Sequence, residues 1–413
     1  MHYFHLRAQP VTQYVGKAQR TWRLQVVGVL LGLLCVCASV TCVAQPGRLS
    51  ESATVSLLTC APGSETYALF GHSALRITDP VQGIDQVYNY GTFDFQTSHF
   101  YWRFVRGNLR YYLSAVPFAS FSQAYEQEGR AVAEQVLNLQ PQEVQRLYAR
   151  LESTLHSEAR YYRYQFFSDN CSTRLFTLIN ESTNAPLQLD SARVAAATYR
   201  QLLRPYLAPA PWVKLGMNLG LGLPADHQTH YRQRLFLPLE LFQAMARATH
   251  RGKPLVARQQ QVVAADSAGV PAPAGIVPMQ VLLGWLLGSV LVWRIKPLSW
   301  LHQVNMRVVF GVTGALGCLL AGLALVSLHE PVQANYQLLW LLPSHIALAL
   351  GRRRSWWLRY AAVAMLLLLL GGIIAAVLGY GLLLPEVGML LLLLLGQLLL
   401  IWAGQRREEE HQG

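Results

Sequence analysis

Residues 70–77 read FGHSALRI, and residues 166–174 read FFSDNCSTR. The first run places His72 at the start of a strand-like stretch. The second places Cys171 where an extended aromatic segment turns into a helix, because the Asp-Asn pair before it supplies good N-cap residues. A histidine on a strand and a thiol in the first turn of a helix are the base and the nucleophile of a thiol enzyme. The two runs therefore predict both a mixed fold and a chemistry.

The region around these runs is predicted to be an α+β domain. Alternating apolar and polar residues indicate strands at residues 53–60, 73–78, 86–90 and 131–139. Helical patterns follow at residues 141–156, from Cys171 onward, at 191–203 and at 236–245. Strands followed by helices are typical of helices packed against an antiparallel sheet.

The apolar residues of the chain are concentrated at its two ends. Of 413 residues 52% are hydrophobic and only 14% are charged, and the excess lies in the first 45 residues and after about residue 275. Apolar runs at residues 275–293, 308–328, 336–351, 361–384 and 387–403 predict a bundle of about five transmembrane helices. The arginines that produce much of the net charge of +12 border these runs, as positive-inside signals do, so we expect no nucleic-acid partner.

These patterns divide the chain into five parts. Residues 1–44 are predicted to be a signal peptide or an N-terminal anchor, and residues 45–250 an exported catalytic domain. Residues 251–274 read as a linker, 275–404 as the transmembrane helices and 405–413 as a cytoplasmic tail. No acidic or basic residue lies well inside the apolar runs, which argues against an ion-coupled transporter.

The cysteines leave two alternatives for the thiol. Three of the six lie in the signal region and Cys318 lies in an apolar run, so only Cys60 and Cys171 belong to the exported part. An oxidising compartment allows these two to form a disulfide. The other prediction is a reactive thiol, because the helix dipole and unpaired N–H groups stabilise a thiolate at Cys171.

The remaining site residues are predicted from their positions on the strands and helix. His72 is the candidate general base, and Asn89 on the neighbouring strand is the candidate that orients the imidazole, with Tyr88, Tyr90 and Asp85 as rivals. The candidate substrate-binding residues are Arg76, Tyr88, Tyr90, Asn170 and Arg174. Asp226, His227 and His230 hint at a metal site, but further ligands at zinc spacing are missing, so we expect neither a metal nor another cofactor.

Longer motifs add a resemblance to a known family. They read LLTCAPG at residues 57–63, FGHSALR at 70–76, VYNYGTF at 87–93 and DNCST at 169–173. A histidine upstream of an Asn-Cys pair resembles the circularly permuted papain-like enzymes, which include NlpC-type amidases and lecithin:retinol acyltransferase-like enzymes. The whole pattern, with PAD at 224–226 and FLP at 236–238, most resembles the N-terminal periplasmic domain of bacterial Lnb proteins.

The resemblance implies a lipoprotein N-acyltransferase of the bacterial inner membrane, with its catalytic domain in the periplasm. A phospholipid would be the acyl donor, and the N-terminal cysteine amine of a diacylated lipoprotein the acceptor. By the match Cys171 takes the family's cysteine role and His72 its histidine role, whereas Asn89 rests on strand position alone. Two alternatives stay open: a cell-wall peptide amidase or cysteine peptidase with the same dyad, and a non-catalytic membrane-anchored binding domain with Cys60 and Cys171 bridged.

Overall fold

The computed structural model describes residues 47–413 except 193, 266–274, 296, 298, 352–355, 378–384 and 411–413. The predicted signal or anchor segment, residues 1–44, lies outside the described residues, as does the end of the predicted tail. Residues Arg48–Gly413 form one compact unit, which contains a sheet domain followed by a helical region. The prediction of an α+β domain followed by helices is confirmed.

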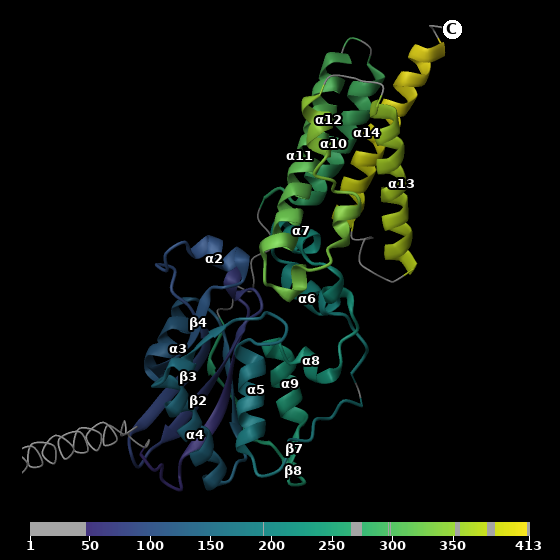
Figure 1. Cartoon of the computed structure of the whole chain (residues 1–413). Helices are drawn as coiled ribbons and strands as arrows, with labels where there is room; N and C mark the ends of the chain where they lie inside the picture. Colours follow the sequence, from purple (N-terminus) through teal and green to yellow (C-terminus); the bar gives the residue numbers. More distant parts are fainter. Residues whose placement is uncertain are drawn as a thin grey trace, which may run out of the picture. The chain divides into compact units, whose positions relative to one another are not determined.

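The sheet domain is built on one antiparallel sheet of seven strands, in the order β6-β4-β3-β2-β1-β5-β9 (Figure 1). The strands are β1 (Thr54–Cys60), β2 (His72–Asp79), β3 (Ile84–Thr92), β4 (Arg110–Pro117), β5 (Val132–Leu137), β6 (Tyr161–Arg163) and β9 (Val256–Val263). The central strands β1, β2 and β3 are paired over most of their length, so the strand that begins at His72 is held on both sides.

Helices cover both faces of this sheet. Helices α4 (Pro141–Leu155), α5 (Cys171–Ser182) and α9 (Pro238–Arg247) pack on one face around a core that includes Leu57, Leu75 and Leu175. Helix α3 (Phe118–Gln127) covers the other face, over Cys60 and Ala74. Further short elements are α2 (Phe100–Arg106), α6 (Tyr199–Leu207), α7 (Pro211–Gly220), α8 (Tyr231–Arg234), β7 (Thr249–His250) and β8 (Lys253–Pro254).

The structure differs from the sequence predictions in two places within this domain. The predicted linker 251–274 contains β9, whose middle residues are exposed and which pairs with β5 at the edge of the sheet. An exposed Gln-rich strand lacks the apolar alternation that marks a half-buried strand. The helix predicted to begin at Ser191 is α6, which begins at Tyr199 because Thr198 caps it by accepting the N–H of Gln201.

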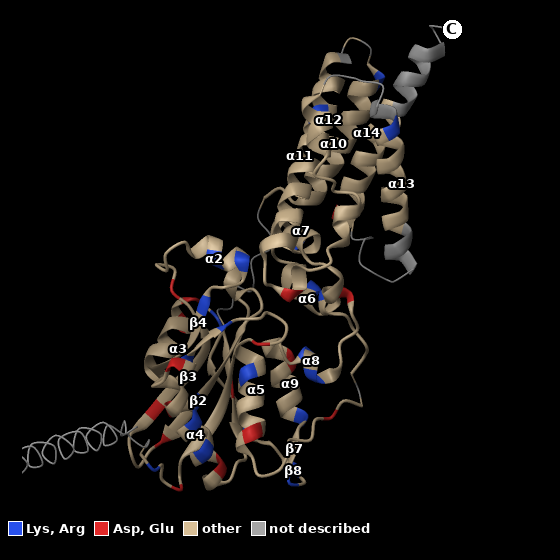
Figure 2. Cartoon of the chain, in the orientation of Figure 1, with Lys and Arg blue, Asp and Glu red and all other residues tan. Residues whose placement is uncertain are grey.

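The helical region consists of α10 (Pro278–Arg294), α11 (Ser299–Val326), α12 (His345–Leu350), α13 (Trp356–Val377) and α14 (Pro385–Glu410). Figure 2 shows that charged residues are frequent on the sheet domain and sparse on these helices. Among the described residues the stretch Trp300–Val326 is long and apolar enough to cross a membrane, and the shorter apolar stretches are Pro278–Arg294, Arg359–Gly372 and Pro385–Ile401.

The third predicted span, residues 336–351, is wrong as a continuous helix. It forms a 3-10 turn at Tyr336–Leu339 and then the six-residue helix α12. Glycines of α11 allow this segment to approach closely, since a Cβ at Gly317 would lie 2.4 Å from the carbonyl oxygen of Leu341. The segment therefore packs along α11 instead of forming an independent spanning helix.

Buried polar contacts connect helices α6 and α7 to the helical region. Arg200 of α6 forms a bidentate ion pair with Asp226, at 2.7 and 2.9 Å, and donates to the Tyr336 hydroxyl at 3.3 Å. Lys214 of α7 pairs with Glu386 of α14 at 2.8 Å. Asp226, which the sequence offered as a possible metal ligand, is thus engaged by an arginine.

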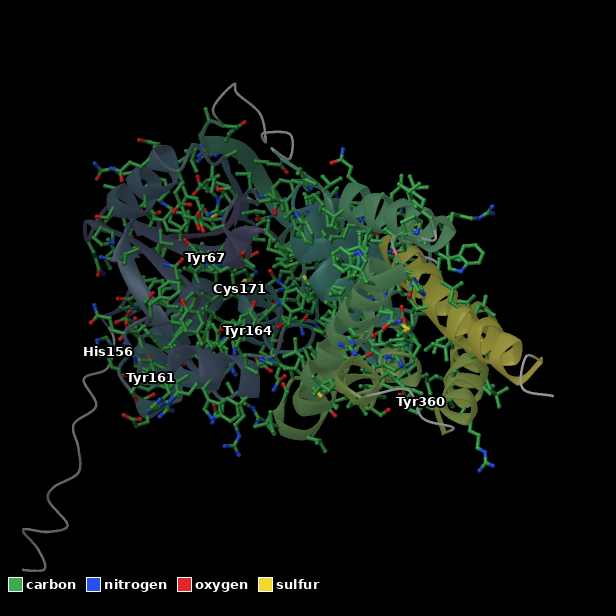
Figure 3. The ribbon with its side chains drawn as sticks, turned by 90° about the horizontal axis from the view of Figure 1, so that it is seen from above. Tyr67, His156, Tyr161, Tyr164, Cys171 and Tyr360 are labelled. Carbon is green, nitrogen blue, oxygen red and sulfur yellow. The ribbon has the colours of Figure 1, made fainter. Side chains whose placement is uncertain are left out.

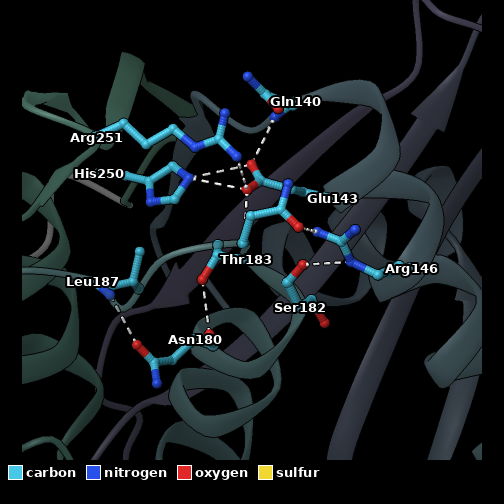
Figure 4. A network of polar contacts seen from close by, with 10 residues as sticks. Gln140, Glu143, Arg146, Asn180, Ser182, Thr183, Leu187, His250 and Arg251 are labelled. Atoms are coloured by element: carbon cyan, nitrogen blue, oxygen red, sulfur yellow. Dashed lines mark hydrogen bonds and ion pairs between the residues drawn. The ribbon is translucent and has the colours of Figure 1, made fainter.

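Glu143 is the centre of a buried polar network that holds α4 (Figure 4). Its carboxylate accepts the backbone N–H groups of Asn184 at 2.8 Å and Gln140 at 2.9 Å, and contacts His250 Nε2 at 3.1 Å. Burial by itself would raise the pKa of Glu143, but these donors lower it below its ordinary value. The network joins the start of α4, the loop after α5 and the β7–β8 hairpin.

We expect Glu143→Gln to destabilise the protein by about 3 kcal/mol, because it leaves buried donors of this network without a charged acceptor. The contribution of Glu143 is present above the ordinary carboxyl pKa, about 4.3, and is lost as the pH falls through the lowered folded-state pKa. Thermal unfolding of the detergent-solubilised protein between pH 3 and 7 measures both effects. Glu181→Gln is the control, since Glu181 is half exposed in its ion pair with Arg150. Equal melting temperatures for the two variants would contradict the prediction.

Candidate active site

Cys171 is the first residue of α5, and the loop before it is fixed by Asn170. The Asn170 Oδ1 atom accepts the Thr173 N–H at 3.0 Å, and the Thr173 hydroxyl accepts the Asn170 N–H at 2.8 Å. The Asn170 Nδ2 atom donates to the carbonyl oxygens of Phe166 at 2.9 Å and Phe236 at 2.7 Å. This capping box satisfies the third N–H of the helix, and the first N–H groups of a helix lack an intrahelical acceptor. The thiol therefore stands at the positive end of the helix dipole.

His72 begins β2 beside the end of β1, where Cys60 is its paired residue. Gly71 precedes it with φ at +76°, and a Cβ there would lie 2.6 Å from the Cys60 carbonyl oxygen. Both the left-handed backbone and the close approach require glycine at this position. The turn that aims the histidine is thus specified by the residue before it.

The imidazole of His72 lies between the thiol and an amide. Its Nε2 atom is 3.2 Å from Asn89 Oδ1, and the Asn89 Nδ2 atom points to the Val87 carbonyl oxygen at 3.4 Å. With Nε2–H donated to Asn89, Nδ1 is the nitrogen left for the hydrogen bond with the Cys171 thiol. The structure brings together the three residues that the sequence proposed as nucleophile, base and orienting group.

The electrostatics of the pair favour a thiolate. Burial raises the pKa of Cys171, but the His72 imidazole, the Ser73 backbone N–H and the Ser172 hydroxyl together lower it below its ordinary value. Burial lowers the pKa of His72, and the neighbouring Cys171 and Asn89 raise it above its ordinary value. Both shifts point toward transfer of the thiol proton to the imidazole.

Cys60 differs from Cys171 in that its pKa is raised, not lowered. Both Cys60 and Cys171 are free thiols in the structure, so the predicted alternative of a disulfide is not formed. Burial beneath α3 raises the pKa of Cys60 to about 12, against the smaller lowering effects of Tyr125 and Arg130. Cys60 is therefore a protonated core residue.

The difference in pKa between Cys171 and Cys60 predicts that an alkylating reagent modifies Cys171 selectively. At pH 7 we expect iodoacetamide to modify Cys171 and to leave Cys60 unmodified in the folded protein, because the thiolate is the nucleophile. Peptide mass spectrometry after a timed quench measures the modified fraction at each position. The unfolded protein is the control, in which both cysteines should react alike. Equal modification of the two thiols in the folded protein would contradict the assignment.

Residues that the sequence analysis did not assign also surround the thiol. Gly91, at φ +95° in a β-bulge of β3, allows close packing: a Cβ there would lie 3.9 Å from Cys171 Cβ, 3.9 Å from the Tyr162 hydroxyl and 3.6 Å from the Tyr164 ring. Figure 3 labels Cys171 and Tyr164 in the sheet domain. The Tyr162 hydroxyl is buried and has no hydrogen-bond partner among the described residues. Tyr162 lies in the three-residue strand β6, which is too short for an alternation pattern to mark it in the sequence.

Ser73 is another residue beside the thiol that the sequence analysis did not assign. Its backbone N–H helps to lower the pKa of the Cys171 thiol. Its hydroxyl lies 3.0 Å from the Ser172 hydroxyl in a buried contact that ties β2 to α5.

Three of the five predicted substrate-binding residues are bonded to other residues of the protein. Arg76 forms a bidentate ion pair with Asp85, at 2.7 and 2.8 Å, and contacts Glu134 at 3.2 Å. Tyr88 is buried and its hydroxyl donates to Glu152. Both side-chain polar atoms of Asn170 are hydrogen-bonded within the protein, Oδ1 to the Thr173 N–H and Nδ2 to two backbone carbonyl oxygens. The structure therefore argues against direct substrate contact by Arg76, Tyr88 and Asn170, because each is already occupied.

The other two, Tyr90 and Arg174, line a cavity of about 600 Å³ between α4 and α5. Arg174 forms a bidentate ion pair with Asp169, at 2.6 and 2.7 Å, and lies 3.5 Å from the centre of the Tyr162 ring. Cys171 and His72 are not among the residues that line this cavity. Its two arginines, Arg150 and Arg174, both face carboxylates, which weakens any attraction for an anion.

Two family models match the chain. The Lnb N-terminal periplasmic domain matches residues 49–205, and the Lnb transmembrane domain matches residues 272–408. No curated protein and no solved structure matches, so the likeness to the papain-like enzymes stays a prediction. The periplasmic match contains both β2 and the start of α5, and the transmembrane match contains α10 to α13 and all but the last two residues of α14. The chain is therefore a member of the Lnb family, a membrane protein with a periplasmic domain followed by a transmembrane domain.

Proposed function

We propose that this protein is a thiol-dependent lipoprotein N-acyltransferase of the bacterial inner membrane. It would move a fatty acyl group from a phospholipid to the N-terminal cysteine amine of a diacylated lipoprotein. The observation that carries the proposal is the Cys171–His72–Asn89 arrangement at the N-terminus of α5, in a periplasmic domain joined to a transmembrane domain. Residues 45–250 would supply the catalytic domain and residues 275–404 the membrane-embedded part, with β9 extending the former into the expected linker.

The first half-reaction acylates the enzyme. His72 takes the proton of Cys171, and the thiolate attacks an ester carbonyl of the phospholipid. The negative charge on the carbonyl oxygen is stabilised by the helix N-terminus and by the Tyr162 hydroxyl, which stays protonated because burial and the nearby Cys171 raise its pKa. The C–O bond then breaks, and the lysophospholipid alkoxide takes the proton from the imidazolium. The products are an acyl thioester on Cys171 and a neutral His72.

The second half-reaction transfers the acyl group to nitrogen. The α-amine of the lipoprotein attacks the thioester carbonyl, His72 takes a proton from the amine, and the C–S bond breaks. The leaving sulfur is a thiolate that the imidazolium stabilises, so the resting pair is restored together with an amide. Two sequential half-reactions on one thiol predict ping-pong kinetics. Both substrates are anchored by acyl chains, so a membrane-tethered thiol meets them at high effective concentration.

The mass of a lipoprotein's N-terminal lipopeptide tests this proposal. Cells depleted of their own N-acyltransferase would express the wild type, Cys171→Ala or the control Cys318→Ala, whose thiol lies on α11 away from the site. We expect one added acyl chain with the wild type and with Cys318→Ala, and none with Cys171→Ala. No added chain with any of the three, in folded protein with Cys171 reduced, would refute acyl transfer and favour the amidase reading.

A further inference from the structure

Helix α2 and the loop before it carry an unusual exposed aromatic surface. The helix reads FYWRFVR and contains no acidic residue. Its exposed fractions are 79% for Tyr101, 54% for Trp102 and 49% for Phe104, and Phe95 in the preceding loop is 59% exposed. Contiguous exposed apolar side chains on a soluble surface mark an interaction site. Aromatic residues next to arginines are the composition of segments that lie at a membrane–water interface.

The end of α2 is bonded to the point where α11 ends. The Leu328 N–H donates to the Arg106 carbonyl oxygen at 2.9 Å, and His329 Nε2 donates to the Phe104 carbonyl oxygen at 2.8 Å. Gly107 lies against His329, since a Cβ at Gly107 would be 3.2 Å from the His329 backbone nitrogen. The apolar stretch of α11 ends at Val326, two residues before this contact. α2 is thereby joined to the end of the stretch that is long and apolar enough to cross a membrane.

A series of aromatic ring contacts leads from α2 to the thiol. Phe104 stacks on Phe100, whose ring centre is 5.9 Å from that of Phe93. The ring centres of Phe93 and Tyr111 are 5.4 Å apart, and those of Tyr111 and Tyr164 are 4.7 Å apart. Tyr164 lies beside Gly91, where Cys171 also packs. These ring contacts connect α2 with the residues that pack around Cys171.

We infer that residues 95–106 insert into the lipid surface on the periplasmic side of the membrane, between the headgroups and the acyl chains. Tyr101, Trp102 and Phe104 enter the interface, and the basic side chains of Arg103 and Arg106 meet lipid phosphates. The continuity of α2 with the end of α11 identifies lipid as the occupant of this surface. The inference deepens the proposed function, because it rests on a phospholipid donor and gives the side from which that donor reaches Cys171.

Fluorescence quenching tests the insertion without any catalysis. Full-length Cys171→Ala protein, with its other accessible cysteines replaced, is labelled at Trp102→Cys with bimane and reconstituted in phosphatidylethanolamine–phosphatidylglycerol nanodiscs. Lipids with a nitroxide near the headgroup should quench this label strongly. The control label at Val81→Cys, in the exposed turn between β2 and β3, should be unaffected. Equal quenching at the two positions overturns the inference. So does protection from aqueous iodide without nitroxide quenching, which would show a second copy or another segment of the chain covering α2.

A second variant connects the surface to the reaction. With Cys171 intact, Tyr101→Ser together with Trp102→Ser should lower acyl transfer from vesicle phospholipid about tenfold or more, since two interfacial anchors are lost. Acylation of Cys171 by a water-soluble p-nitrophenyl ester should be unchanged. A loss of both activities would indicate a folding defect or a role at the site and would contradict the inference. If the wild type fails to transfer acyl groups to lipoprotein, the proposed function is refuted, while the quenching result still decides the insertion.

Discussion

His72→Ala is expected to lower the rate of acyl transfer by roughly 10²–10⁴-fold, the range that general acid–base catalysis supplies. The variant loses the acceptor for the thiol proton in the first half-reaction and the proton donor for the lysophospholipid alkoxide. It also loses the largest influence that lowers the pKa of Cys171, so that pKa should rise. The initial rate of lipoprotein acylation by the purified full-length protein in nanodiscs measures the first effect.

The pH dependence of alkylation separates this role from a loss of folding. In the wild type the reaction of Cys171 with iodoacetamide should persist well below the ordinary thiol pKa, about 8.5. In His72→Ala the half-point should move above that value, because the thiol stays protonated in its buried surroundings. His156→Ala is the matched control, since His156 is largely exposed on the far end of α4. An unchanged alkylation profile in His72→Ala would refute the assigned pair.

The core of the candidate site could be predicted because its signals are local. An Asp-Asn pair before a cysteine specifies a helix start, and the structure places Cys171 there with Asn170 as the cap. The hairpin between residues 73–78 and 86–90 is short, so its pairing follows from the sequence. Its register pairs Leu75 with Tyr88, which brings Asn89 beside the strand that carries His72.

The surroundings of the site could not be predicted because they depend on distant pairing. Arg76 shares an alternation face with His72 and forms its bidentate ion pair with Asp85 of the neighbouring strand β3. Its second and buried partner, Glu134, comes from β5, which the chain reaches only after β4 and α3, so the sequence did not show that Arg76 is held from both sides. Tyr162 belongs to β6, a strand of three residues at the sheet edge, which is too short for an alternation pattern.

The structure of the third predicted membrane span could not be predicted either, because it also depends on a contact with another segment. Hydropathy measures composition, and residues 336–351 are apolar enough to suggest a span. Their structure is set by Pro343, which interrupts a helix, and by glycines of α11 that accept a close backbone approach at Leu341 and Ile346. Helix packing at small residues is a property of two segments together, so a pattern within one segment does not reveal it.

Gly71→Ala is expected to abolish activity by displacing His72. Alanine at φ +76° costs about 1 kcal/mol, and its Cβ would meet the Cys60 carbonyl oxygen at 2.6 Å, a contact with backbone in the central pair β1–β2. Relief of that overlap requires the start of β2 to move, at a further cost of about 1–3 kcal/mol. The hydrogen bonds of His72 to Asn89 and Cys171 tolerate no such movement, because proton transfer requires contact distances.

Gly83→Ala provides the matched control, because Gly83 also has positive φ, at +65°, but a Cβ there would meet no atom within 4 Å. It should keep full acyl-transfer activity and lose only about 1 kcal/mol of stability. The comparison therefore separates the backbone strain that both variants share from the steric overlap that only Gly71→Ala introduces. Thermal unfolding and the acylation rate are measured on both proteins. Retained activity in Gly71→Ala would mean that the turn can move without the histidine, and that the geometry of the base does not depend on the β1–β2 contact.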